Sequence, residues 1–398
     1  MNTKKGIKVK RGKTKRFKSK NIKRRGNKIS LKAILFIMLL LGISFLGYSV
    51  IAPILDVIRH PQKEEPDPSV PIVTTTDSSG SPVVTTEPID ENPPKKQEVF
   101  SCFLDVSALA SIDALNTALD SIPKVPLQYN AVVVPLKSKG GALNYATALE
   151  IAISARSNQG SLALADIFET ISKKGFTPVA EINLLEDSIY PKTFGDTSYT
   201  LASGASWYDN NPANGGKPWL SPFSTGTKTY LQEVLTEINT AGFTNIILSS
   251  ACFPPFRPSD LNIVVNPVQG IDRYKAITDL VSSLLANLPE SEPTVVVNAN
   301  DIFNGTADVL KPDILQVPYA IEFNIPSFGN RITIGEIVLD LGYSTAPEKL
   351  RTILQQIKEL YPTLEYTPLL SRYGLTDVEL AECDMIFDEF DLLNLMVK

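Results

Sequence analysis

Histidine is almost absent from this sequence. The single histidine, His60, lies in a proline-rich stretch without apolar periodicity. A Ser-His-Asp triad, a Cys-His nucleophile and a His-ligated zinc site all need histidine inside the folded body. The sequence therefore excludes these three kinds of site.

Cysteine is also scarce, and no phosphate-binding glycine motif is present. The three cysteines are widely separated and form no CxxC pair, which argues against a zinc ribbon or a disulfide scaffold. No glycine-rich turn opens a helix after a strand, so nothing indicates nucleotide binding. We therefore expect no metal and no cofactor.

Acidic residues are missing from the first 32 positions, which contain fifteen Lys and Arg. The other 366 residues carry 23 basic and 43 acidic side chains. The chain thus combines a basic N-terminal tail with an acidic body. A tail of this kind beside an apolar segment is explained by contact with anionic lipid, and we do not expect nucleic acid as a partner.

Residues 33–55 form an uncharged, mostly aliphatic run. As a helix it spans about 34 Å, enough to cross the hydrocarbon layer of a bilayer. The alternative, a cleaved signal peptide, usually has an apolar region of only ~7–15 residues. We predict a transmembrane signal anchor at the cell membrane, with residues 1–32 in the cytoplasm and the chain after Leu55 outside it.

Residues 56–98 are rich in Pro, Thr, Ser, Asp and Glu and show no apolar period. Such a segment buries too little apolar surface to offset the entropy of ordering. We expect an extended linker that separates the anchor from the body.

Residues 99–398 alternate between apolar β-type runs and helical patterns. Eight runs favour a (β/α)8 TIM barrel over an open doubly wound sheet. Residues 324–345 are expected to form an insertion or an extra strand pair. The predicted strands are 101–107, 129–137, 176–185, 244–253, 294–301, 314–323, 365–373 and 385–390.

Alternation along the predicted strands separates two sets of side chains. On the third strand, Ala180, Ile182 and Leu184 form an apolar face, whereas Val179, Glu181 and Asn183 face the lumen. Polar residues near the ends of other strands are also expected to point inward. They form either an active site or a salt-bridged network, and both interpretations stay open. These residues are Asp105, Lys137, Ser249, Asn298, Asn300, Gln316 and Glu322.

Several segments occur in the order found in a bacterial family of glycoside-hydrolase-like TIM barrels related to the alpha-amylase superfamily, which the body resembles. The matching segments are NAVVVPLKSK (130–139), AEINLLED (180–187), Gly204 with Trp207, Trp219 with Pro222, GFTNIILSSACFP (242–254), DILQVPYAI (313–321) and TPLLSRY (367–373). Family acids are replaced here, because aspartates align with Pro135, Ser249 and Arg372, and an arginine aligns with Cys252.

These departures leave two hypotheses. One is a glycoside hydrolase that acts on peptidoglycan or another polysaccharide and whose catalytic carboxyl pair has moved. The other is a barrel that binds or scaffolds glycans without cleaving them.

The remaining acids limit the choice of catalytic groups. Glu181 and Glu322 are the first candidates, with Asp105 as a third, while Asp388 and Glu389 are alternatives. Substrate contacts are expected from polar residues around them and from aromatic rings, which stack on sugar faces. The expected contacts are Lys137, Asp187, Trp207, Trp219, Asn298 and Asn300.

Overall fold

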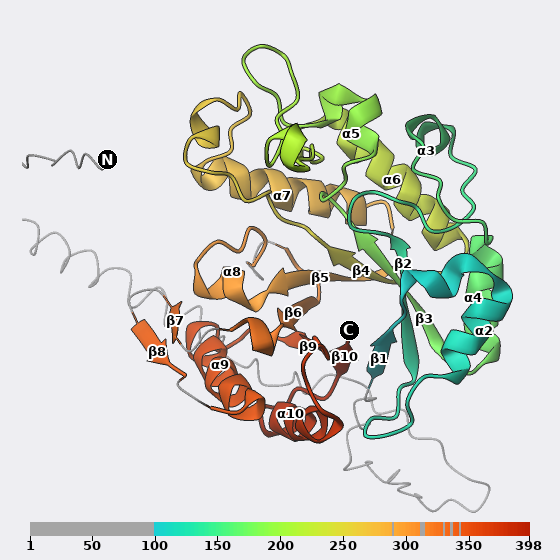
Figure 1. Ribbon diagram of the computed structural model, residues 1–398, viewed down its shortest axis with the longest axis vertical. Helices are drawn as coiled ribbons and strands as arrows, with labels where there is room; N and C mark the ends of the chain where they lie inside the picture. The colour runs from blue at the N-terminus through green and yellow to red at the C-terminus, as the bar shows by residue number, and fades with distance from the viewer. Residues whose placement is uncertain (1–98, 289, 311–314, 329–330, 335–336, 342–343) are drawn as a thin grey trace, which may run out of the picture. The chain divides into compact units, whose positions relative to one another are not determined.

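The computed structural model describes residues 99–288, 290–310, 315–328, 331–334, 337–341 and 344–398. Within them, eight parallel strands form a closed barrel (Figure 1). The strands follow one another around the ring in chain order, and β10 pairs with β1 to close it. They are β1 (Phe100–Phe103), β2 (Ala131–Lys137), β3 (Thr177–Asn183), β4 (Asn245–Ser249), β5 (Glu292–Asn298), β6 (Tyr319–Phe323), β9 (Tyr366–Leu370) and β10 (Leu395–Val397). The predicted TIM barrel is confirmed.

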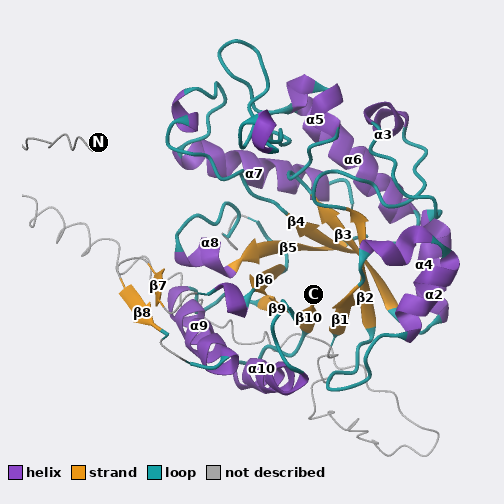
Figure 2. Ribbon diagram, viewed as in Figure 1, coloured by secondary structure: helices purple, strands orange, loops and turns teal. Residues whose placement is uncertain are grey.

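Helices surround the barrel on its outer side (Figure 2). Two of them, α9 and α10, begin with capping boxes formed by Thr345 with Glu348 and by Thr376 with Glu379. The α-helices are α2 (Ile112–Asp120), α3 (Glu150–Ala155), α4 (Leu164–Lys173), α5 (Tyr190–Thr193), α6 (Thr225–Thr240), α7 (Gly270–Leu285), α8 (Ala299–Phe303), α9 (Ala346–Leu360) and α10 (Asp377–Glu389). Short 3-10 helices are η1 (Val106–Ala110), η2 (Gly195–Thr197), η3 (Pro212–Asn214), η4 (Asp260–Asn262) and η5 (Ile325–Ser327).

The predicted eighth strand, 385–390, is wrong. Residues 385–389 belong to α10, whose fully buried residues Leu380, Cys383 and Phe387 are spaced three and four apart, as on one face of a helix. The closing strand is the short segment Leu395–Val397. The alternative catalytic acids on that predicted strand are therefore excluded from the lumen, and the Glu389 carboxylate pairs with Arg351 instead.

The segment 324–345 lies between β6 and α9. Its described part contains an antiparallel pair, β7 (Arg331–Ile334) and β8 (Ile337–Asp340), outside the barrel sheet. This pair agrees with the expected extra strand pair. Because β7 and β8 lie outside the barrel, its seventh and eighth strands are β9 and β10.

The inside of the barrel is filled by a small apolar cluster. Ala131, Val133, Val179 and Ile247 are buried there, and Phe103, Val296 and Met396 pack against them. The intervening residues of the same strands, such as Ala180 and Ile182, join the larger core between strands and helices. The predicted phase of β3 is thus correct, and the next inward position after Val179 is Glu181.

Lys137 departs from this alternation. The β2–β3 register shifts between Pro135 and Lys137, so Lys137 points out of the lumen rather than into it. Its fully buried ammonium group lies 2.9 Å from Asp187 Oδ2, donates to the Asn183 carbonyl at 2.8 Å and sits 5.8 Å from the centre of the Tyr230 ring on α6. The inward orientation expected for Lys137 is therefore wrong. Its side chain instead holds the end of β3 against the helix layer.

The predicted cytoplasmic tail, membrane anchor and linker (1–32, 33–55 and 56–98) lie outside the described residues. Among the helices that the structure describes, none combines the length and apolarity needed to cross a bilayer.

The position of the closing strand can be tested by stability. Leu395 is 1% exposed and Met385 is 58% exposed. We expect Leu395→Ala to lower the free energy of unfolding by about 2–5 kcal/mol, because a buried side chain is lost. Met385→Ala should stay within about 0.5 kcal/mol of wild type. Urea unfolding measures both, and equal losses would argue for 385–390 as the strand.

The buried Lys137–Asp187 pair gives a second test. Lys137→Met or Asp187→Asn leaves one charge buried without its partner, so each should cost about 3–5 kcal/mol. The double variant removes both charges and should lose clearly less than the sum of the two. A double-mutant cycle by urea unfolding measures this coupling. Additive losses would contradict it.

Candidate active site

A cavity of about 910 Å³ opens at the carboxyl ends of the barrel strands. Its floor contains inward residues near the ends of four strands and the residue after β10. They are Glu181 on β3, Ser249 on β4, Asn298 on β5, Glu322 on β6 and Lys398. Residues 250–256 after β4 form one wall, and residues 301 and 306–309 after β5 form another. Active sites of TIM barrels lie at this end.

Glu181 is 4% exposed and is the most strongly held acid on the cavity floor. Its Oε1 accepts hydrogen bonds from Ser249 Oγ at 3.0 Å and from Lys398 Nζ at 2.8 Å. The same ammonium group lies 5.0 Å from the centre of the Phe103 ring. Both neighbours donate, so Glu181 is fixed in position as a hydrogen-bond acceptor.

Glu322 lies on another side of the floor, three strands away from Glu181 around the barrel. It pairs in register with Asn298 on β5 and with Leu369 on β9. Within the described residues, its carboxylate has no hydrogen-bond or ion-pair partner. The structure thus brings Glu181 and Glu322 into one cavity, one fixed by donors and the other open to a ligand.

A strained backbone position lies beside the floor. Ser250 has a φ of 53°, which is uncommon for a residue with a side chain. Its hydroxyl donates to Asn183 Oδ1 at 2.9 Å, and Asn183 Nδ2 donates to the Lys137 carbonyl at 3.2 Å. Both ends of the Asn183 amide are therefore fixed at the cavity wall.

Asp308 joins the two outer walls. Asp308 accepts from the Phe253 backbone N–H at 2.9 Å, and its other oxygen lies 3.1 Å from Arg273 Nε on α7. The Arg273 guanidinium also stacks 4.7 Å from the centre of the Phe253 ring. Asp308 therefore ties the connection after β4 to the connection after β5.

Asp301 is a further acid in the cavity, on the first turn of α8. Burial raises the pKa of its carboxyl group, and the charge of Asp308 adds to this, while Thr306 and Arg273 oppose it. The sequence placed residue 301 at the end of a strand, although β5 ends at Asn298 and α8 follows. Asp301, Asp308, Arg273 and Lys398 were missed because no pattern in one sequence connects these distant positions.

Trp219 and Asn298 line the cavity among the expected substrate contacts. Trp219 Nε1 donates to Asp209 Oδ2 at 3.1 Å, which fixes the ring. The Asn298 side chain accepts from the Asn300 N–H and so caps α8.

Five expected site residues do not line this cavity. Lys137 and Asp187 are buried in their mutual ion pair, with Asp187 Oδ1 also accepting from the N–H groups of Ile189 and Tyr190. Asn300 lies on α8 because the strand ends two residues earlier. The expected substrate contacts of Lys137, Asp187 and Asn300 are therefore wrong. The register shift in β2 turns Lys137 out of the lumen toward Asp187, and β5 ends before Asn300.

Asp105 and Trp207 are the other two. Asp105 is exposed and caps η1, where hydrogen bonds from Ser107 hold the pKa of its carboxyl below the usual range. Trp207 is buried against Phe256, with ring centres 4.5 Å apart, and against Tyr199. Asp105 therefore acts as a helix cap, and Trp207 packs a loop.

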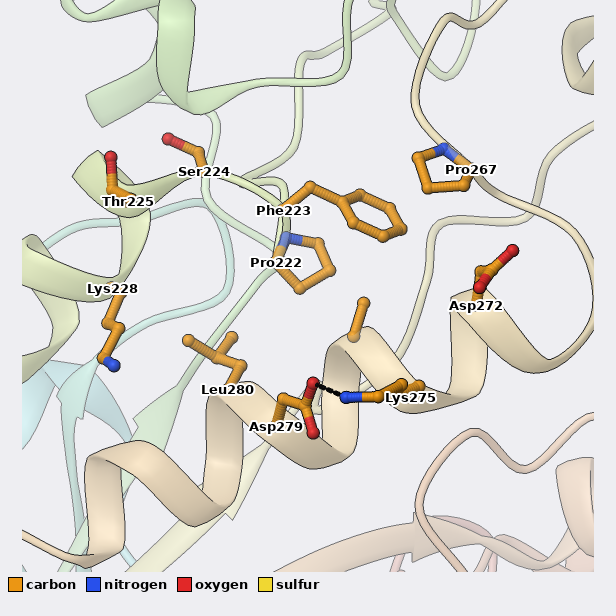
Figure 3. Close-up of a pocket in the computed structure, with 11 residues that line it drawn as sticks. Pro222, Phe223, Ser224, Thr225, Lys228, Pro267, Asp272, Lys275, Asp279 and Leu280 are labelled. Carbon is orange, nitrogen blue, oxygen red and sulfur yellow. Dashed lines mark hydrogen bonds and ion pairs between the residues drawn. The ribbon is translucent and has the colours of Figure 1, made fainter.

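A second, smaller cavity of about 340 Å³ lies between α6 and α7 (Figure 3). Pro222, Phe223 and Pro267 line it, and Lys275 pairs with Asp279 at its edge. It shares no lining residue with the barrel cavity. Its charged groups are surface side chains, so the barrel cavity is the better candidate for chemistry. In the described part of the chain, no three His, Cys, Asp or Glu residues cluster as a metal site.

Comparison with known proteins finds one matching family and several solved structures of low sequence identity. A family model described as "Putative glycosyl hydrolase domain" matches residues 101–321. No curated protein sequence matches the chain.

Three solved structures are similar to parts of this chain. A hypothetical protein from Ruminiclostridium thermocellum ATCC 27405 is 17% identical, with 49% of this chain and 96% of that chain covered and a TM-score of 0.42. A chitobiase from Flavobacterium johnsoniae is 14% identical, with 68% and 37% covered and a TM-score of 0.42. The glycoside hydrolase domain of PelA from Pseudomonas aeruginosa is 11% identical, with 76% and 94% covered and a TM-score of 0.40.

The family match runs from β1 into β6 and includes the ends of β3, β4 and β5, where the floor of the cavity is built. It extends over more than half of the chain. The protein therefore belongs to this family of glycosyl hydrolase domains.

Proposed function

We propose that this barrel is a glycoside hydrolase acting on a cell-envelope or extracellular polysaccharide, with Glu181 and Glu322 as catalytic carboxyl groups. The observation that carries the proposal is that both carboxyl groups open into one cavity at the carboxyl end of the barrel. Glycosidic cleavage uses carboxyl groups on two sides of the bond, one acting at the anomeric carbon and one at the departing oxygen.

The surroundings of Glu181 suit the first of these tasks. Lys398 and Ser249 both donate to it and fix its position. A carboxylate held in this way can face the anomeric carbon, where positive charge develops in the transition state. Glu322 brings a second carboxyl group into the cavity from β6.

The rest of the cavity suits a sugar. Trp219 offers an aromatic ring at one wall, while Asn298 offers an amide for a hydroxyl group. Aromatic rings combined with a few placed polar groups are typical of binding sites for small polar ligands.

The alternative, a barrel that binds glycans without cleaving them, is favoured by residues that replace or neutralise acids. Ser249 stands where the resembling family has an aspartate, and Lys398 neutralises Glu181. Arg372, at another such position, pairs with Asp377 at 2.7 Å and does not line the cavity. The alternative requires glycan affinity without turnover.

We also propose that residues 33–55 anchor the protein in the cell membrane and hold the barrel outside the cytoplasm. The length of the apolar run and the concentration of positive charge before it support this proposal. An extracytoplasmic barrel would have direct access to wall polysaccharide.

Catalysis can be tested by neutralising single acids. In the full-length chain, Glu181→Gln and Glu322→Gln should each lower kcat/KM about 10²–10⁴-fold, because each removes a group acting on the reacting bond. The assay is release of reducing ends from peptidoglycan and a polysaccharide panel. Glu186→Gln is the matched control, since Glu186 lines the same cavity but pairs with Lys139 at its edge. It should change kcat/KM only a few-fold.

Three results separate the two functions. Turnover that is lost only in the Glu181 and Glu322 variants supports the hydrolase. Glycan binding by the wild type without turnover, unaffected by Glu181→Gln, supports the non-catalytic barrel. A wild type that shows neither glycan binding nor turnover contradicts both functions.

The membrane proposal predicts the location of the C-terminal end. Alkaline phosphatase fused after Lys398 should be active in cells, because this enzyme folds productively only outside the cytoplasm. A green fluorescent protein fused at the same place and exported in the same way should stay dark. The reverse pattern would place the barrel inside. A variant lacking residues 33–55 is the control and should reverse both signals.

A further inference from the structure

The acids of the barrel cavity differ in how their charges are compensated. Three of them have a cationic partner in the cavity: Glu181 with Lys398, Glu186 with Lys139, and Asp308 with Arg273. Within the described residues, Asp301 and Glu322 have no partner at ion-pair distance. These two acids are therefore the ones left for a ligand or a reacting group.

Asp301 and Glu322 come from adjacent parts of the barrel wall. The Asn298 side chain ends β5 and caps α8, and Asp301 lies three residues later in the first turn of that helix. Asn298 is also the register partner of Glu322 on β6. Both acids thus belong to the β5–β6 side of the cavity, whereas Glu181 belongs to β3.

The environment of Asp301 differs from that of the other cavity acids. Within the described residues, its carboxylate receives one hydrogen bond, from Thr306 Oγ1 at 3.2 Å. Burial is the main reason why the pKa of Asp301 is raised, and the negative Asp308 raises it further. The Thr306 hydroxyl and the positive Arg273 act in the opposite direction but are outweighed. Asp301 therefore keeps its proton to a higher pH than an ordinary aspartate.

We propose that Asp301 is the general acid of the hydrolysis, a role that rests on the function proposed above. The bond between the anomeric carbon and the glycosidic oxygen breaks, and its electron pair stays on the departing oxygen. That oxygen takes the proton of Asp301 and leaves as a hydroxyl group. Water supplies the new oxygen on the anomeric carbon, and its released proton restores Asp301 through solvent, so one water is consumed for each bond.

In this scheme Glu181 and Glu322 serve the sugar side of the bond, and Asp301 serves the departing oxygen. The arrangement replaces the third acid expected from the sequence, Asp105, with one that lines the cavity. The proton donor is then mounted on a short helix fixed at the end of β5, which is a rigid support.

Leaving-group dependence tests this assignment. The probes are phenyl and 2,4-dinitrophenyl glycosides of glucose, galactose and N-acetylglucosamine in both anomeric forms, incubated with the full-length chain. Phenolate needs a proton to depart, whereas dinitrophenolate does not. Asp301→Asn should lower kcat about 10²–10⁴-fold on the phenyl series and less than about tenfold on the dinitrophenyl series. Glu181→Gln and Glu322→Gln should lose activity on both series.

Thr306→Val provides a second measurement that does not depend on removing the acid. The Thr306 hydroxyl lowers the pKa of Asp301, so its loss should move the alkaline limb of the kcat profile to higher pH. A purely structural role for this region would leave that limb in place. Urea unfolding of each variant establishes that the chain is folded.

The outcomes separate the two proposals. The role of Asp301 is overturned, while the hydrolase stands, if Asp301→Asn is as active as wild type on the phenyl series. It is also overturned if Glu322→Gln keeps its activity on the dinitrophenyl series and loses it only on the phenyl series. An alkaline limb that does not move in Thr306→Val also overturns it. A wild-type chain that hydrolyses neither these glycosides nor the polysaccharide panel overturns the hydrolase and, with it, this assignment.

Discussion

Closure of the sheet is the constraint on which the remaining structure depends. In a closed barrel, successive side chains must point alternately to the lumen and to the helices. Val133, Val179 and Ile247 therefore fill the inside, while their neighbours join the outer core. At the carboxyl ends the same alternation brings Glu181, Asn298 and Glu322 to one floor. Polar groups that are far apart in the chain become a single site because eight short segments close a ring.

The same alternation explains how much could be predicted. The β3 segment alternates clearly, so the inward position of Glu181 was readable from the sequence. Lys137 was misplaced because a register shift in β2 reverses the alternation, and nothing in one sequence marks that shift. The closing strand was missed because Leu395–Val397 is too short to show a period, and α10 contains an apolar run that resembles a strand.

The polar walls of the cavity were harder to predict. Arg273 lies on α7 and Asp308 follows α8, and only the fold brings the two together. Lys398 reaches Glu181 across 217 positions of the chain. Such pairs have no local signature, because their spacing depends on the lengths of intervening loops. Inward residues of a regular strand such as β3 could therefore be assigned, whereas Lys137 beside a register shift and the ion-paired residues on the connections could not.

The link made by Asp308 has a consequence for how a polymer reaches the floor. One buried carboxylate holds the backbone of Phe253 and the side chain of Arg273 at once, so the two rims cannot swing apart independently. The β4–β5 side of the cavity entrance is thus braced as one unit. Under the proposed function, a sugar chain that enters along this side meets one braced surface instead of two separate loops.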